Sequence, residues 1–154
     1  MKTNTKKIFE YANRKNVAIC AFNVSNLETM QAVIEGAIEE NVPVIVSASE
    51  SAIKYAGLNV LVSMFDALTS QTKLPIALHL DHGASYDICK KCIAAGFSSV
   101  MFDGSALAFD ENVAIPRKVA SLAHRHDVTV EAELGRIIDR KSTRLNPVTD
   151  VSRM

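Results

Sequence analysis

Residues 75–83 of the chain are Pro75-Ile76-Ala77-Leu78-His79-Leu80-Asp81-His82-Gly83. The apolar part of this stretch is continuous rather than alternating, which is typical of a strand buried on both faces of a parallel sheet. Pro75 stands at the entrance of the strand, where a missing N–H is tolerated. Asp81 and His82 follow at the carboxyl end, the edge at which α/β proteins place their active sites. The stretch therefore predicts a buried parallel strand with polar groups at its carboxyl end.

Four more runs are rich in β-branched and other apolar residues and predict strands. They cover residues 17–23, 43–48, 99–102 and 128–133. Helical spacing of apolar residues predicts helices over 26–40, 58–69, 85–95 and 110–126, with a further helix within 1–15. Asn26 or Ser25 can cap the first of the helices between strands. Pro116 is expected either to kink the last helix or to mark its real start.

The spacing of the strand starts gives the period of the fold. Strands start at or near Val17, Val44, Ile76, Ser99 and Val128, which are 27, 32, 23 and 29 residues apart. This spacing is close to the roughly 30 residues of a βα unit. A closed (β/α)8 barrel needs eight such units and typically about 250 residues, whereas this chain of 154 residues holds about four units and a fifth strand. The sequence therefore predicts an α/β protein that is either a small doubly wound domain or the first half of a (β/α)8 TIM barrel.

The last residues depart from this pattern. From Asp139 to Met154 the chain has no apolar periodicity, which is typical of a disordered segment. We therefore expect one α/β domain over residues 1–138 and a disordered C-terminal tail over residues 139–154.

The composition narrows the classes of function. Lys and Arg total 17, as do Asp and Glu. This zero net charge argues against nucleic acid as the main partner, because phosphate binding needs a basic surface. No apolar run is long enough to span a bilayer, the N-terminal residues do not form a secretory signal, and three cysteines cannot all pair with one another. We expect a soluble protein of the cytoplasm that binds neither nucleic acid nor membrane.

Polar residues end the later strands, as they end the strand at 76–80. Asp103 follows the strand at 99–102, and Glu133 ends the strand at 128–133. Because the carboxyl ends of parallel strands meet at one edge, these carboxylates are expected to converge on Asp81 and His82, which favours a metal site or a polar catalytic site. Helix capping and loop polarity are the alternative for each residue taken alone. Glu131 lies two residues before Glu133 and so points to the same face of the strand, which leaves either glutamate open as the functional one.

Asn23 and Ser49 end the first two predicted strands. At that edge of the sheet their side chains could contact a substrate. The alternative is ordinary turn chemistry, which both residue types favour.

Three further features are interpreted as structural. Cys89-Lys90-Lys91-Cys92 is a CxxC within a predicted helix, where both thiols fall on one face; this favours buried structural cysteines over a redox or zinc motif. His79 lies inside its strand and is expected to be a hydrogen-bonded core residue. His124 and His126 end a predicted helix, where cations suit the helix dipole.

Four motifs follow one another along the chain: AFNVSNLE (21–28), HLDHG (79–83), SVMFDGS (99–105) and VEAELG (130–135). In order and spacing they resemble the zinc-dependent class II aldolases, the family of fructose-bisphosphate and tagatose-bisphosphate aldolases, from about residue 5 to about residue 137. The resemblance implies a TIM barrel and a divalent zinc ion. It also implies reversible cleavage of a ketose 1,6-bisphosphate to dihydroxyacetone phosphate and glyceraldehyde 3-phosphate, by an enzyme that is a homo-oligomer.

The resemblance also implies a role for each residue at these strand ends. Asp81 resembles the acid/base that handles the C4 hydroxyl proton, and His82 resembles the first of three catalytic zinc ligands. Asp103 and Glu133 resemble ligands of a second metal position. Asn23 and Ser49 resemble residues of the family that contact the substrate. Besides zinc, the resemblance implies no further cofactor.

The chain departs from the family in its later part. The family's second and third zinc histidines and its glycine-rich phosphate loops have no counterpart in this sequence, and the tail after Ile138 does not resemble the family. We therefore expect the N-terminal half of the aldolase domain, and we expect the isolated chain to be inactive. Two alternatives stay open: a non-catalytic half barrel that acts by self-association or by binding a partner, and an unrelated doubly wound binding domain. The choice between fructose and tagatose bisphosphate is also open.

Overall fold

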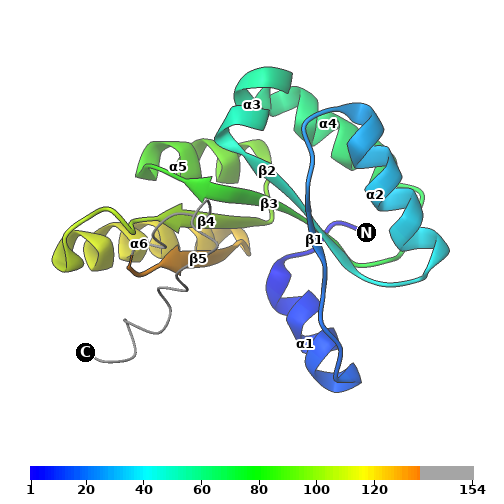
Figure 1. Ribbon diagram of the computed structural model, residues 1–154, viewed down its shortest axis with the longest axis horizontal. Helices are drawn as coiled ribbons and strands as arrows, with labels where there is room; N and C mark the ends of the chain where they lie inside the picture. The colour runs from blue at the N-terminus through cyan, green and yellow to red at the C-terminus, as the bar shows by residue number, and fades with distance from the viewer. Residues whose placement is uncertain (136–154) are drawn as a thin grey trace, which may run out of the picture.

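Five parallel strands form one sheet in the order β1-β2-β3-β4-β5 (Figure 1). The computed structural model describes residues 1–135. The strands are β1 (Ala21–Asn23), β2 (Val44–Ser49), β3 (Ile76–Gly83), β4 (Ser99–Asp103) and β5 (Thr129–Glu133). Each strand pairs with the next one along the chain, so all the carboxyl ends lie at one edge. The predicted boundary at residue 138 and the predicted tail lie outside the described residues.

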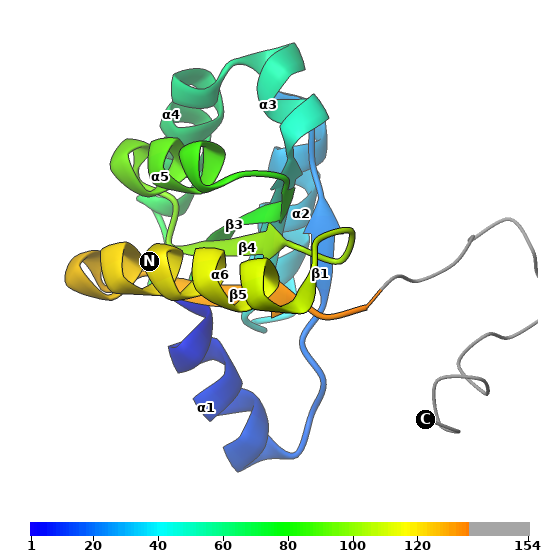
Figure 2. The same cartoon turned by 90° about the vertical axis from the view of Figure 1, so that its left-hand side faces the viewer.

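Helices alternate with the strands and cover one face of the sheet (Figure 2). They are α2 (Leu27–Glu39), α3 (Glu50–Ala56), α4 (Leu58–Thr69), α5 (Tyr86–Ala95) and α6 (Phe109–Ala123), the last followed by a 3-10 turn at His124–His126. The first helix, α1 (Thr5–Lys15), lies against the opposite face, where Ile8 packs on Ile45 and Ala77 near the strand starts. This alternation confirms the predicted α/β class and its repeated βα unit.

The caps explain where several helices begin. Asn26 accepts a hydrogen bond from the Thr29 N–H at 2.9 Å, and Ser85 caps α5 in the same way through the Ile88 N–H. A short polar side chain at this position satisfies one of the free N–H groups of the first turn. Of the two caps that the sequence left open for α2, the structure uses Asn26.

The central strands carry the core on both of their faces. Toward the helices, β2, β3 and β4 bury branched and aromatic side chains such as Val46, Leu78 and Phe102, which pack in one cluster with Phe65 of α4. Burial of this apolar surface is the main source of stability in a sheet covered by helices. On the opposite face a polar contact is buried as well, where the His79 imidazole lies 2.8 Å from the Ser99 hydroxyl.

Two residues or motifs predicted to be structural are confirmed as such. His79 is 5% exposed, and burial lowers its pKa because a charged imidazole loses solvation there. Cys89 and Cys92 are buried and free, and burial raises the pKa of their thiols to about 11 and about 12. Such thiols stay protonated at neutral pH and are inert.

The structure corrects the prediction at three places. The first strand spans only 21–23 instead of 17–23, and all three of its residues are exposed, because no further strand pairs with its outer edge within residues 1–135. Helix α3 was not predicted, since its seven residues are too few to show a clear period. Of the two alternatives for Pro116, a helix start is wrong, since α6 begins at Phe109 and continues through Pro116.

No helix within residues 1–135 has both the length and the apolar character needed to cross a bilayer.

Candidate metal and catalytic site

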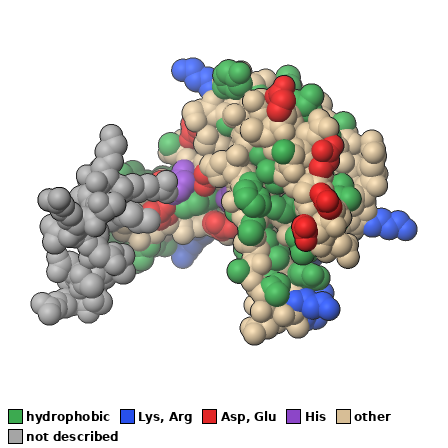
Figure 3. All heavy atoms as spheres, turned by 45° about the vertical axis from the view of Figure 1, so that its right-hand side comes forward, with side chains coloured by type: hydrophobic (Ala, Val, Ile, Leu, Met, Phe, Trp, Pro, Cys, Tyr) green, Lys and Arg blue, Asp and Glu red, His purple; other side chains and the backbone are tan. Residues whose placement is uncertain are grey.

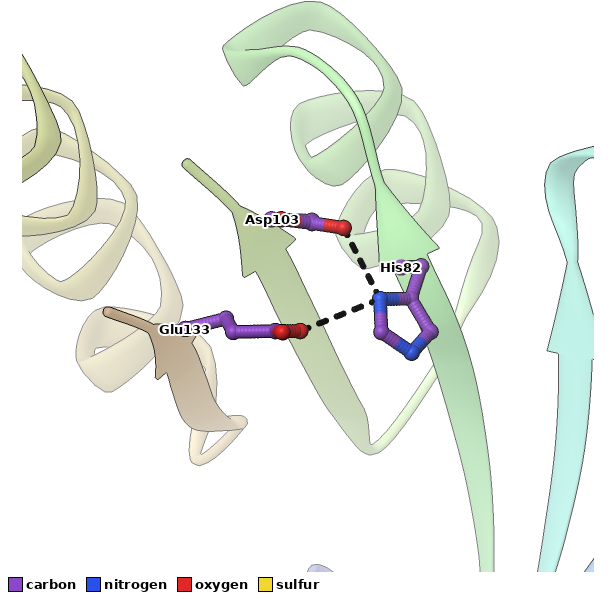
Figure 4. A group of neighbouring side chains, drawn as sticks. All are labelled: His82, Asp103 and Glu133. Carbon is purple, nitrogen blue, oxygen red and sulfur yellow. Dashed lines mark hydrogen bonds and ion pairs between the residues drawn. The ribbon is translucent and has the colours of Figure 1, made fainter. Parts of the chain in front are cut away.

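The carboxyl ends of β3, β4 and β5 bring one imidazole and two carboxylates together (Figure 4). His82 lies on β3, Asp103 ends β4 and Glu133 ends β5. Asp103 and Glu133 are directly paired in the register of the two strands, and side chains in register on parallel strands leave the same face of the sheet. The strand pairing therefore places the two carboxylates on the same face of the sheet, at neighbouring strand ends.

The contacts in this group are short. The His82 Nδ1 lies 2.9 Å from Asp103 Oδ2 and 3.3 Å from Glu133 Oε2. One ligand atom from each of the three residues lies within 4.8 Å of the other two. Of the four histidines in the chain, His82 is the one in this group.

A local distortion of β3 orients the imidazole of His82 toward the two carboxylates. The pairing of β3 with β4 shifts between Leu80 and Gly83, and His82 has a φ of +51°, a left-handed conformation that is uncommon for a residue with a side chain. Gly83 is required by space, since a Cβ there would lie 2.9 Å from the Met101 carbonyl oxygen. The bulge turns the side chain of His82 toward β4 and β5 instead of letting it continue the alternation of the strand.

Helix α3 supports the residues that follow His82. Its first residue, Glu50, accepts a hydrogen bond from the Ala84 N–H at 2.6 Å. A carboxylate that binds the backbone just after Gly83 restrains the turn that presents His82. The sequence did not predict this role, although Ser49 followed by an acidic residue is a helix-start signal.

The charges in the group favour the protonated imidazole. The pKa of His82 is raised, chiefly by its hydrogen bond with Asp103 and further by the charges of Asp81, Asp103 and Glu133. The pKa of Asp103 is lowered, chiefly by hydrogen bonds from Ser105 and then by His82. Three carboxylates around one imidazole form a site that attracts a cation, whether a proton or a metal ion.

Asp81 stands beside this group and has a separate partner. Its Oδ2 accepts a hydrogen bond from Asn23 Nδ2 at 2.8 Å, and its Oδ1 lies 3.8 Å from His82 Nε2. The side chain is 25% exposed, so solvent and small molecules can reach it. The structure therefore brings Asn23 and Asp81 together, from β1 and β3, across the end of β2.

Ser49 lies next to Asp81 in register, but its hydroxyl is used locally. It accepts from the Ala52 N–H at 3.3 Å, as the cap of α3, and lies 2.8 Å from the Ser51 hydroxyl. Ser49 and Asn23 both line a pocket of about 350 Å³ that Tyr55 also borders. Ser49 therefore acts as a helix cap, in line with the alternative considered for it, and it also borders the pocket.

The group of three includes Glu133 and leaves Glu131 out. Glu131 is exposed and contributes no atom to the group, although it points to the same face of β5. A buried helix residue, Asn112, binds the Glu133 backbone through its amide, and no pattern in the sequence predicts this contact. An asparagine inside a helix pattern looks like any other polar position.

The donor set of His82, Asp103 and Glu133 fits a divalent metal ion. An imidazole nitrogen and carboxylate oxygens are ordinary zinc ligands, and catalytic zinc sites use three protein ligands and keep a further position open. All three side chains are between 16% and 40% exposed, so an ion can enter. The site can therefore bind a metal ion next to a free carboxylate, that of Asp81.

Comparison with known families and proteins gives one consistent result. The family model described as fructose-bisphosphate aldolase class-II matches residues 3–153. A fructose-bisphosphate aldolase of Treponema pallidum is 49% identical over 139 residues, covering 86% of this chain and 42% of that protein. One of Helicobacter pylori strain J99 is 42% identical over 139 residues, covering 90% of this chain and 45% of that protein. The chain thus spans about half the length of the curated relatives it matches.

Solved structures agree with this result. The YdjI aldolase of Escherichia coli K12 superposes with a TM-score of 0.81 at 31% identity, over 88% of this chain and 53% of that one. The fructose-bisphosphate aldolase of Campylobacter jejuni gives 0.75 at 27% identity, over 87% and 46%. Together with the parallel sheet, these matches confirm the half of a TIM barrel that the sequence predicted and reject the unrelated doubly wound domain.

The first testable consequence concerns the metal-free protein. The His82 imidazole should titrate above its ordinary pKa of about 6.5, and Asp103→Asn should bring the titration back toward that value. Because the folded pKa is raised, the stability that His82 contributes is complete below about pH 6.5 and is lost as the pH rises through the folded pKa. Histidine ring resonances in NMR spectra measure this, with Asp87→Asn on α5 as the control. A wild-type His82 that titrates at or below 6.5 would contradict the geometry.

Proposed function

The chain belongs to the class II fructose-bisphosphate aldolase family, and we propose that it supplies the metal-binding and acid/base residues of an enzyme that cleaves a ketose 1,6-bisphosphate. The products are dihydroxyacetone phosphate and glyceraldehyde 3-phosphate, and the reaction is reversible. One observation carries the proposal: His82, Asp103 and Glu133 meet at the ends of three neighbouring strands with Asp81 beside them.

The proposed metal is zinc, held by His82, Asp103 and Glu133 together at one position, whereas the resemblance implies one position for His82 and a second for the two carboxylates. When bound, zinc supplies a Lewis acid that stabilises negative charge on the carbonyl oxygen of the substrate. The two carboxylates balance the charge of the ion, and the left-handed backbone at His82 keeps the imidazole aimed at it. No lysine ends any of the five strands, which fits a mechanism without a Schiff base.

Asp81 is the proposed acid/base. Cleavage breaks the C3–C4 bond, leaves the bonding electron pair on C3, and requires that the C4 hydroxyl lose its proton as C4 becomes an aldehyde. A carboxylate at this position accepts that proton and returns it in the condensation direction. The hydrogen bond from Asn23 holds Oδ2 of Asp81 and leaves Oδ1 on the side of His82, which orients the carboxylate for the transfer.

Asn23 and Ser49 are the proposed substrate-side residues. Both border the 350 Å³ pocket, and both neighbour Asp81, Asn23 through its hydrogen bond and Ser49 through the strand register. An amide and a hydroxyl both donate and accept hydrogen bonds, as recognition of a sugar hydroxyl requires. The proposed location is the cytoplasm and the proposed assembly is a homo-oligomer. The free cysteines fit a reducing compartment.

A second candidate function is self-association without catalysis. Its support is the surface at β1, where Phe22 is 48% and Val17 is 49% exposed. Both line an apolar pocket of about 690 Å³ between β1 and α2, on the side of the molecule that Figure 3 brings forward. A second copy of the chain could cover this surface and the exposed strand edge.

Zinc binding tests the proposed metal site. We expect His82→Ala and Glu133→Gln each to weaken zinc binding by more than about 100-fold, since loss of a mere neighbour of a ligand already costs 10- to 100-fold. Affinity should also fall as the pH drops through the raised pKa of His82, because a protonated imidazole cannot bind metal. Competition with a coloured chelator measures both effects. Glu131→Gln, on the same face of β5, is the matched control and should bind as wild type does; equal losses in the two glutamate variants would refute the assignment.

The acid/base role is tested in a chimera in which residues 1–135 replace the matching part of the Treponema pallidum aldolase. We expect zinc-dependent cleavage of fructose 1,6-bisphosphate by the chimera and little by the 154-residue chain alone, where one imidazole stands in the described site. Asp81→Asn should lower kcat of the chimera by about 10²- to 10⁴-fold, with Asp87→Asn as the control. A fully active Asp81→Asn chimera, or rapid cleavage by the isolated chain, would overturn these expectations.

Light scattering after size exclusion tests the second candidate. Self-association predicts a dimer that persists on dilution and that Phe22→Glu converts to a monomer. Val60→Glu introduces the same charge at an exposed position of α4 and should leave the dimer intact. A monomeric wild-type chain would exclude this function.

A further inference from the structure

A buried amide joins helix α6 to the end of β5. Asn112, in the first turn of α6, is 7% exposed. Its Nδ2 donates a hydrogen bond to the Glu133 carbonyl oxygen at 2.8 Å. Because a backbone carbonyl can only accept, this bond fixes which end of the amide faces β5.

The residue held in this way is the last one of an edge strand. Within residues 1–135, β5 pairs with β4 alone, and Ala132 and Leu134 on either side of Glu133 are exposed. Strand ends with exposed neighbours open readily. The Glu133 carboxylate has one polar side-chain partner in this part of the chain, His82. Its position therefore depends on how firmly its backbone is held.

The other end of the Asn112 amide lies against the end of β4. A Cβ added to Gly104 would overlap with Asn112 Oδ1 and would lie 2.9 Å from Phe102 Cε1. Asn112 Oδ1 is buried, and it has no hydrogen-bond partner within residues 1–135. Such an atom is costly to bury, so a packing role alone would be served better by an apolar residue. Gly104 directly follows Asp103, so one amide contacts the backbone at both carboxylates.

We propose that Asn112 is a positioning residue of the metal centre. Its amide, which fits only against a glycine at position 104, fastens the end of β5 to α6 and sets Glu133 opposite Asp103 at the distance that lets both reach His82. This inference rests on the metal site proposed above. Asn112 itself touches no metal and no substrate.

Zinc affinity of the full 154-residue chain tests the inference. Asn112→Ala and Asn112→Asp should each weaken zinc binding by about 10- to 100-fold, as loss of a group that orients a ligand does. Asn112→Asp keeps the size of the side chain but replaces the donating NH2 with an oxygen that can carry negative charge, so it carries the test if the alanine variant fails to fold. Gly104→Ala should weaken binding to a similar degree, because its methyl group displaces the amide. The absorption spectrum of bound Co²⁺ should change in all three variants, since it reports the geometry of the ligands.

Two control variants separate positioning from a general loss of stability. Val113→Ala changes the next residue of α6, which is 41% exposed. Val62→Ala removes buried methyl groups that lie 3.7 Å from where a Gly96 Cβ would be, near the start of β4 and away from Asp103. Both controls should keep the zinc affinity and the Co²⁺ spectrum of the wild type.

The outcomes are distinct. Wild-type affinity in both Asn112 variants, or an equal loss in Val62→Ala, would overturn the positioning role while leaving the metal site intact. A wild-type chain that binds neither Zn²⁺ nor Co²⁺ would overturn the metal site itself and the inference with it.

Discussion

The parallel pairing of β3, β4 and β5 is the constraint on which the rest of the site depends. Parallel strands all end at the same edge, so three residues that are far apart in the sequence are delivered to one place. The register sets Asp103 opposite Glu133, and the shift between Leu80 and Gly83 turns His82 toward both. A slip of one residue between β4 and β5 would place the two carboxylates on opposite faces of the sheet.

The same geometry gathers three negatively charged carboxylates around one imidazole. Asp81, Asp103 and Glu133 crowd around His82, which lies within 4 Å of each of them. Carboxylates gathered around one side chain in this way repel one another unless a cation lies among them. In the metal-free chain a proton on His82 offsets part of this negative charge, and the pKa of His82 is raised chiefly by its hydrogen bond with Asp103 and further by the three carboxylates. A divalent ion offsets this negative charge more fully. Metal binding at this site therefore requires that His82 release its proton.

Much of this arrangement could be predicted from the sequence, because its signals are local. The central strands are continuous apolar runs, and β2, β3 and β4 appear within a few residues of their predicted bounds. Asp81, His82, Asp103 and Glu133 could be named because each ends such a run. The two failures have different causes. Helix α3 is too short to show a period, and β1 is shortened because its outer edge has no partner within residues 1–135.

The sequence by itself determined the α/β class, the succession of strands and helices along the chain and the edge at which the site lies, since these follow from hydrophobic period and from the position of polar residues after each run. Only the tertiary structure decided which residues meet. Glu131 and Glu133 share a face, so the pattern could not separate them, whereas the strand end brings only Glu133 to His82. The supports from Glu50 and Asn112 are contacts between a helix side chain and a distant backbone group. No local pattern encodes such a contact, because it exists only once the helices have packed on the sheet.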